Sequence, residues 1–124
     1  MVMFDGPEPI YVQIAEQLRR QVLDGTLAAG DQVMSTTQYA TTFRINPATA
    51  AKAFAQLVDE GVLYKQRGVG MFVAEGARER LREQRRGAFF TDRVDGLIAE
   101  ASALGVSADE LVAYIRTNQK GNDR

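Results

Sequence analysis

The first clear pattern in the chain is an apolar stripe between residues 10 and 22. Its members recur at every fourth position: Ile10, Ile14, Leu18 and Val22. This spacing is close to the helical period and predicts an amphipathic helix. Pro9 opens it at a position where a missing N–H leaves no helical hydrogen bond unmade, and Gly25 ends it. A turn-rich connector and a short extended segment at 32–34 are expected to follow.

Two further helices are predicted, each with a capping signal at its start. Ser35, with Gln38 three residues later, forms a capping box and predicts a short helix. Asn46 followed by Pro47 predicts the start of the next helix, because an asparagine side chain accepts from the first N–H groups and proline fits the first helical position. The core face of this helix is expected at Ala50, Ala53, Phe54, Leu57 and Val58.

After Gly61 the pattern changes from helical to extended. Two short apolar runs, 62–64 and 71–73, flank a basic loop that contains Gly68 and Gly70. This arrangement predicts a β-hairpin. The order helix, short helix, turn, helix and hairpin is that of a winged helix-turn-helix. We therefore expect such a domain over residues 1–76.

Residues 77–124 form a second amphipathic region, predicted to contain helices with Ser107 as the cap of the last one. Two helices cannot bury these apolar faces by themselves, so we expect a second copy of the chain to cover them. Packing against residues 1–76 is the alternative. The predicted fold class is mainly α with a small β-hairpin, followed by a helical dimerisation segment. The expected dimerisation residues are Phe89, Phe90, Val94, Leu97, Ile98, Ala101, Leu104, Leu111 and Ile115.

Composition removes several function classes. The chain has no cysteine and no histidine, which excludes disulfides, thiolate nucleophiles, imidazole bases and the usual zinc and iron ligand sets. The neighbouring carboxylates Asp59–Glu60 and Asp109–Glu110 would point to different sides of a helix, so we expect no enzyme, no cofactor and no metal. No secretory signal and no apolar run near the roughly 20 residues of a membrane span is visible, which predicts a soluble cytoplasmic protein.

Six segments carry a shared order and spacing: Pro9–Ile14, Gly25-x-Leu27-x-x-Gly30, Ser35, Asn46–Leu57, Gly61 and Gly68-x-Gly70-x-Phe72-Val73. Together they resemble the GntR family of bacterial regulators. The short C-terminal part resembles the YtrA-like subgroup, whose members have two helices there and no large effector domain. The resemblance implies a transcription regulator, expected as a repressor, that binds a palindromic operator in double-stranded DNA as a homodimer. Where the family usually has a DNA-contacting arginine, this chain has Thr37.

The candidate DNA-binding residues belong to the second helix, the start of the third helix and the hairpin. The third helix would direct its positive dipole end and free N–H groups at a phosphate, and Ala48 would contact a thymine methyl group. Lys65 and Arg67 would form a basic wing beside the minor groove, turned by Gly68. The full set is Ser35, Thr36, Thr37, Arg44, Asn46, Ala48, Thr49, Lys52, Lys65, Gln66, Arg67 and Gly68.

Two alternatives remain open at this point. The net charge of −1 lacks the basic excess of many DNA-binding proteins. It leaves room for a winged-helix protein-interaction module that does not bind DNA. A small cavity near Phe89, Phe90 and Tyr114 would suit a small apolar or aromatic effector of unknown identity, while core packing is the other use of these rings.

Overall fold

The computed structural model describes residues 4 and 6–119. Their contacts divide the chain into two units, Met1–Gln84 and Arg85–Arg124, with the division inside α4. The elements in chain order are α1 (Ile10–Leu23), β1 (Gln32–Val33), α2 (Thr36–Phe43), α3 (Pro47–Asp59), β2 (Leu63–Gln66), β3 (Gly70–Val73), α4 (Ala77–Phe89), the π-helical turn η1 (Phe90–Val94), α5 (Asp95–Ala103) and α6 (Ala108–Asn118). The expected winged helix-turn-helix and C-terminal helices are confirmed.

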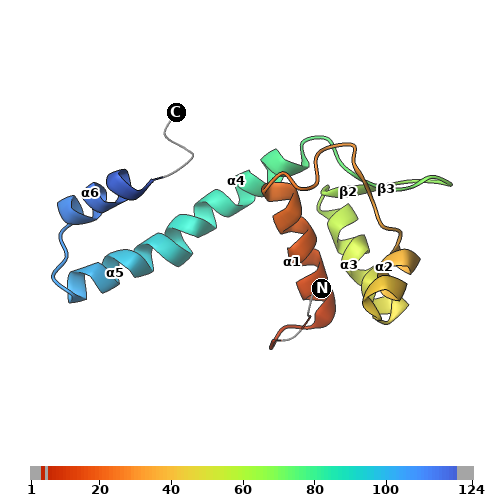
Figure 1. Cartoon of the computed structure of the whole chain (residues 1–124), viewed down its shortest axis with the longest axis horizontal. Helices are drawn as coiled ribbons and strands as arrows, with labels where there is room; N and C mark the ends of the chain where they lie inside the picture. Colours follow the sequence, from red (N-terminus) through yellow and green to blue (C-terminus); the bar gives the residue numbers. More distant parts are fainter. Residues whose placement is uncertain (1–3, 5, 120–124) are drawn as a thin grey trace. The chain divides into compact units, whose positions relative to one another are not determined.

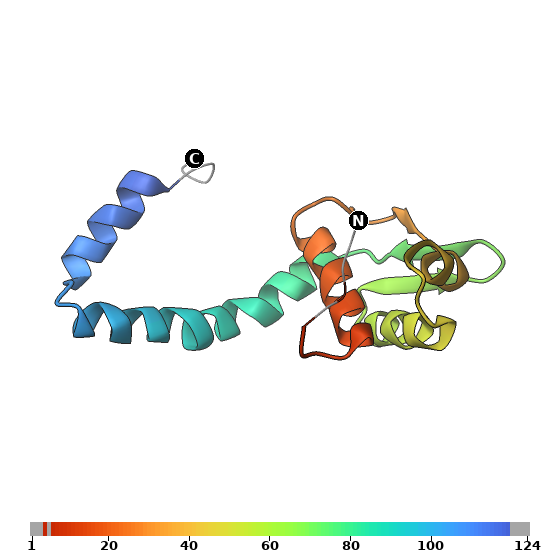
Figure 2. The same ribbon diagram turned by 60° about the horizontal axis from the view of Figure 1, so that its bottom comes forward.

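The first unit contains a small antiparallel sheet with the strand order β1-β3-β2. The predicted hairpin pairs Leu63 with Val73 and Gln66 with Gly70. The short extended segment at 32–34 contributes β1, in which Gln32 pairs with Phe72. The β2–β3 hairpin extends beyond α1, α2 and α3 in both views (Figures 1 and 2).

The core of the first unit lies between α1 and α3. The α1 stripe supplies Ile14, Leu18 and Val22, each at most 5% exposed, and α3 supplies Ala50, Ala53, Phe54 and Leu57, each at most 2% exposed. Burying one large aliphatic or aromatic side chain contributes about 1.5–3 kcal/mol. Ala77 and Leu81 at the start of α4 belong to the same core, so the first unit extends past the expected boundary between residues 76 and 77.

The predicted caps are confirmed at atomic detail. Ser35 Oγ accepts from the N–H of Gln38 at 3.0 Å, and Gln38 Oε1 accepts from the N–H of Ser35 at 3.4 Å. Ser107 and Glu110 form the same reciprocal pair at the start of α6.

One predicted core residue is not buried. Val58 was predicted in the core and this was wrong: its side chain is 37% exposed. It lies at the edge of the α3 stripe and lines an open groove.

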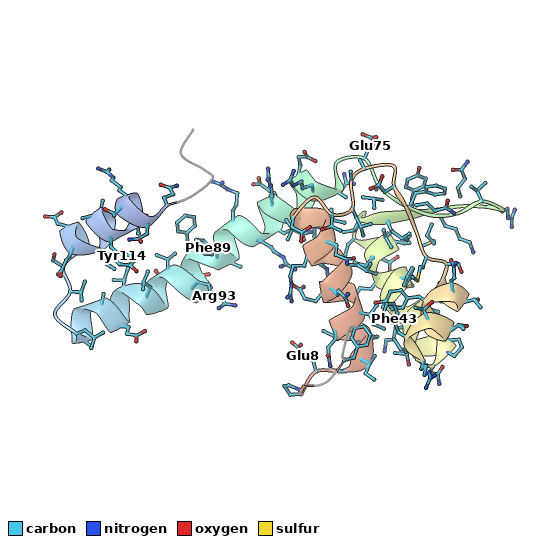
Figure 3. All side chains as sticks on the ribbon, in the orientation of Figure 1. Glu8, Phe43, Glu75, Phe89, Arg93 and Tyr114 are labelled. Atoms are coloured by element: carbon cyan, nitrogen blue, oxygen red, sulfur yellow. The ribbon has the colours of Figure 1, made fainter. Side chains whose placement is uncertain are left out.

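The second unit is helical and leaves most of its apolar side chains exposed. Among the expected dimerisation residues, Ala101 is buried, Val94 and Leu111 are half-buried and the others are exposed. Figure 3 shows Phe89 and Tyr114 among the side chains that stand out from these helices. The π-helical turn was not predicted; there Thr91 Oγ1 donates to the main-chain oxygens of Gly87 and Ala88, at 3.4 and 3.3 Å.

Candidate nucleic-acid interface

The start of α3 is tightly capped. Asn46 Oδ1 accepts from the N–H of Ala48 at 2.8 Å, and the Asn46 main-chain oxygen accepts from the N–H groups of Thr49 and Ala50 at 2.9 and 3.1 Å. Pro47 has no N–H to offer. The expected unpaired N–H groups are therefore already bonded within the helix. The positive end of the helix dipole and the nearby side chains are left to attract a phosphate.

The outer face of α3 is built mainly from alanine. Ala48, Ala51 and Ala55 are exposed and lie on the side opposite the buried Ala50, Ala53 and Leu57. Small side chains leave the helix backbone accessible to a close-packed partner. The sequence analysis did not include Ala51 and Ala55 among the candidate residues. Ala55 lies seven residues, or about two helical turns, after Ala48, and this spacing would have placed both on the same face of α3.

Lys52 lies on the same outer face of α3 and leans toward α1. Its Nζ is 4.1 Å from the centroid of the Tyr11 ring, a cation–π contact that restrains the side chain while the residue stays exposed. Thr49, one turn earlier on α3, is half-buried. A restrained Lys52 loses less side-chain entropy when it meets an anion.

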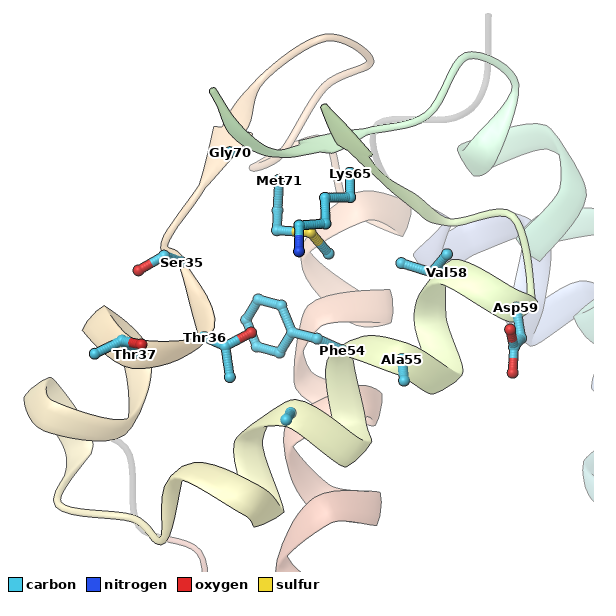
Figure 4. A pocket seen from close by; sticks show the side chains of 11 residues that line it. Ser35, Thr36, Thr37, Phe54, Ala55, Val58, Asp59, Lys65, Gly70 and Met71 are labelled. Carbon is cyan, nitrogen blue, oxygen red and sulfur yellow. The ribbon is translucent and has the colours of Figure 1, made fainter. Parts of the chain in front are cut away.

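An open groove of about 480 Å³ separates α3 from the hairpin. Figure 4 shows Lys65 and Met71 projecting from the strands toward α3, with Thr36 facing Phe54 on the other side. Three predicted hydroxyl residues thus share one groove with a predicted lysine, and Asp59 adds a carboxylate at its edge. The lining residues are Ser35, Thr36, Thr37, Ala51, Phe54, Ala55, Val58, Asp59, Lys65, Gly70 and Met71.

The hairpin tip carries the remaining wing candidates. The N–H of Val69 donates to the oxygen of Gln66 at 2.9 Å and closes a turn over Arg67 and Gly68. Gly68 has φ +77°, a conformation that side chains rarely adopt. Gln32 Nε2 donates to the oxygen of Val69 at 3.1 Å and so connects the tip to β1.

The base of the hairpin is fixed by one arginine. Arg80 Nη2 donates to the main-chain oxygens of Gly61 and Glu75, both at 2.7 Å. These two residues flank the hairpin in the sequence, so Arg80 of α4 holds both of its ends. The wing is therefore a basic tip on an anchored base.

The basic side chains of the first unit fall into two groups. Arg19 of α1 donates to both carboxylate oxygens of Glu60, at 2.9 and 2.7 Å. The hydrogen bond to Glu60 raises the pKa of Arg19 above its ordinary value, against the opposing effect of burial. In contrast, four cations on the helix-turn-helix and wing form no ion pair with any residue that the structure describes: Arg44, Lys52, Lys65 and Arg67.

The predicted site residues therefore fall into neighbouring sets. Four line the groove, three lie on α3 and three form the hairpin tip; the other two lie in the turn between α2 and α3. In the same order they are Ser35, Thr36, Thr37 and Lys65; Ala48, Thr49 and Lys52; Gln66, Arg67 and Gly68; and Arg44 and Asn46. Within the described residues, no group of three or more carboxylates stands close enough together to hold a metal ion, and no helix is long and apolar enough to cross a membrane.

Comparison with known proteins agrees with this architecture. Residues 10–73 match the family described as "Bacterial regulatory proteins, gntR family". The chain is 32% identical over 108 residues to the HTH-type transcriptional repressor YtrA of Bacillus subtilis, covering 87% of this chain and 82% of that protein.

Solved structures extend the likeness to the fold. A GntR family transcriptional regulator from Listeria monocytogenes superposes with a TM-score of 0.67 at 30% identity, covering 92% of this chain and 98% of that one. The DNA-binding domain of AraR in complex with operator ORR3 superposes with a TM-score of 0.51 at 29% identity, covering 59% of this chain and 95% of that one. The chain belongs to the GntR family of bacterial regulatory proteins, which are transcription regulators.

Proposed function

We propose that the protein is a sequence-specific DNA-binding repressor that binds a palindromic operator in the cytoplasm as a homodimer. The observation that carries the proposal is the groove between α2, α3 and the wing, with Lys65 over it. Lys52 and Arg67, on the adjoining α3 face and hairpin tip, form no ion pair with the residues that the structure describes. The operator complex of the related AraR domain supports the same use of this fold.

In this proposal the two units have separate tasks. The first unit reads DNA: Ala48 of α3 contacts a base edge in the major groove. Lys52, Ser35, Thr36 and Arg44 contact phosphates. Thr49, Asn46 and Thr37 would add uncharged contacts, and Lys65, Gln66, Arg67 and Gly68 would follow the backbone beside the minor groove. The second unit pairs two copies through its exposed apolar residues. Two half-site contacts by one dimer multiply a weak single contact.

The competing function is a protein-interaction module that does not bind DNA. Asp59 favours it, because a carboxylate at the edge of the groove repels phosphate. A protein of this second type would show no affinity for random duplex DNA at low salt, whereas a DNA-binding protein shows at least non-specific affinity there.

The test is fluorescence anisotropy of labelled duplexes, recovered by selection from random sequence, over a range of salt concentrations. Lys52→Ala and Lys65→Ala should each weaken binding and reduce the slope of log K against log salt by about one unit, as expected for a lost phosphate contact. Arg82→Ala is the matched control, because Arg82 is an exposed cation on α4 that does not line the groove. An equal change in slope for all three variants would contradict the assigned interface.

A further inference from the structure

The first unit contains a second cleft, of about 230 Å³, between α1, α2 and the segment that includes β1. Most of its lining is apolar, with Leu18, Leu27 and Phe54 among the contributors, and the polar part consists of glutamine amides and one tyrosine. No charged residue lines it. The cleft is thus a neutral site inside the helix-turn-helix itself.

Two polar atoms of the cleft residues are buried without a hydrogen-bond partner among the described residues: Tyr39 Oη and Gln17 Oε1. Tyr39 is only 5% exposed, and burial raises the pKa of its hydroxyl to about 12, which keeps it neutral. A buried polar group with an unmade hydrogen bond costs about 1–3 kcal/mol. Both atoms are covered by neighbouring side chains, so an occupant reaches them only by displacing those side chains. Bonding to the two atoms would then recover part of that cost.

The Tyr39 ring is held in position by its neighbours. Its centroid is 4.6 Å from that of Phe43 on the same helix and 5.5 Å from that of Phe54 on α3. The hydroxyl therefore cannot reach solvent by a small ring rotation without disturbing the packing between α2 and α3.

We propose that this cleft binds a neutral molecule of one-ring size that carries a hydroxyl group, and that its occupation lowers the affinity for DNA. The ring would pack on the apolar lining, and the hydroxyl would donate to Gln17 and accept from Tyr39. A charged ligand is disfavoured because nothing in the lining offsets its desolvation. A cavity of roughly 150 Å³ already admits benzene, so the volume suits a substituted ring.

The link to DNA rests on the proposed function and on the position of the cleft. Phe54 lines both this cleft and the groove on the DNA-facing side, and Met34 of the cleft immediately precedes Ser35 of the groove. An occupant that bonds to Tyr39 has to displace the side chains that cover its hydroxyl, and this displacement would shift the start of α2 relative to α3. These are the elements that must fit one DNA groove together.

The first experiment is an amide NMR titration of the full chain with 4-methylphenol up to millimolar concentration. We expect saturable shifts confined to residues around the cleft, at least fivefold weaker binding of toluene, and no binding of 4-methylbenzoate. In anisotropy, saturating 4-methylphenol should weaken duplex binding at least threefold. No saturable shift with 4-methylphenol would overturn the site.

Tyr39→Phe removes the hydroxyl and keeps the ring. We expect it to abolish the preference for 4-methylphenol over toluene without lowering the thermal midpoint, because the deleted hydroxyl has no partner to lose. Tyr64→Phe is the matched control, since Tyr64 is exposed on β2 and outside the cleft. Gln17→Leu tests the other polar atom independently, should Tyr39→Phe fold poorly.

The outcomes separate the two proposals. An unchanged preference in both Tyr39→Phe and Gln17→Leu would overturn hydroxyl recognition. Binding of 4-methylphenol with no change in duplex affinity would overturn the regulatory role alone. A protein that binds the phenol but no duplex under any condition would overturn the proposed function and leave the ligand site standing.

Discussion

The two units use the same pattern of apolar residues and reach opposite results. In the first unit the stripe on α1 meets α3, and Ile14 and Leu57 are fully buried. In the second unit the predicted stripe leaves Ile98 55% and Leu104 72% exposed. Exposed apolar patches of this kind mark interaction surfaces in soluble proteins.

The difference shows what a periodic pattern can and cannot predict. It identifies the face of a helix that avoids water, because the period depends only on helix geometry. It does not identify the surface that covers that face. In the first unit, the covering surface belongs to the same chain. For the second unit we propose that it belongs to another copy.

The largest effect is expected in the core of the first unit. Leu57→Ala should lower the free energy of unfolding by about 3–5 kcal/mol, because the residue is fully buried and its removal leaves a cavity. Urea unfolding followed by circular dichroism measures this loss. Leu104→Ala deletes the same side chain at an exposed position and should change the unfolding of the first unit by less than about 0.5 kcal/mol. Equal losses would remove the distinction between the units.

The sequence predicts features that depend on neighbouring residues better than features that depend on residues far apart in the chain. The caps at Ser35, Asn46 and Ser107 were predicted correctly, since each depends on residues only two or three positions apart. The pairing of Gln32 with Phe72 was not predicted, because it depends on how the thirty-nine residues between them fold. The π-helical turn was also missed, since no residue type marks it unambiguously.

In the candidate site, too, the sequence predicted some residues and missed others. The sequence predicted the hydroxyl residues of α2 and the basic wing, which carry their chemistry in their side chains. It missed Ala51 and Ala55, whose contribution is the lack of a large side chain on an exposed face. The unpartnered hydroxyl of Tyr39 was invisible as well, because Gln17 and Phe54 reach it only in the folded unit.

The second prediction tests the exposed stripe directly. Ile98→Asp should convert a dimer at micromolar concentration into monomers, because it places a charge where two apolar faces would meet. Analytical ultracentrifugation measures the change. Affinity for a two-site operator should fall on the order of a hundredfold, while affinity for a single half-site should stay the same.

The control for Ile98→Asp is a substitution at the next residue of the same helix. Ala99→Asp adds the same charge to α5 at a neighbouring exposed position, about 100° away around the helix. It should leave both the sedimentation and the operator affinity unchanged. A wild-type chain that sediments as a monomer at micromolar concentration would refute the dimer outright.

The smallest effect concerns Arg44, the one residue in the described part of the chain, other than glycine, with a positive φ. Arg44 ends α2 with φ +55°, and the N–H of the next residue, Ile45, closes the turn by donating to Ala40 at 2.9 Å. This left-handed conformation costs an ordinary residue about 1–2 kcal/mol, and glycine is the usual choice there. The entropy that glycine loses on folding offsets about half of that gain.

Arg44→Gly should therefore raise the free energy of unfolding by up to about 1 kcal/mol and weaken duplex binding at the same time. Arg44→Lys keeps the charge and the strained backbone, so it should retain most of the affinity with no gain in stability. Thermal unfolding and anisotropy on the two variants give both quantities. If Arg44→Gly raises the free energy of unfolding but lowers the affinity for duplex DNA, the first unit gives up stability at this position to keep a cation that faces DNA. A variant that gains stability and binds DNA as before would show that the strain at Arg44 has no such purpose.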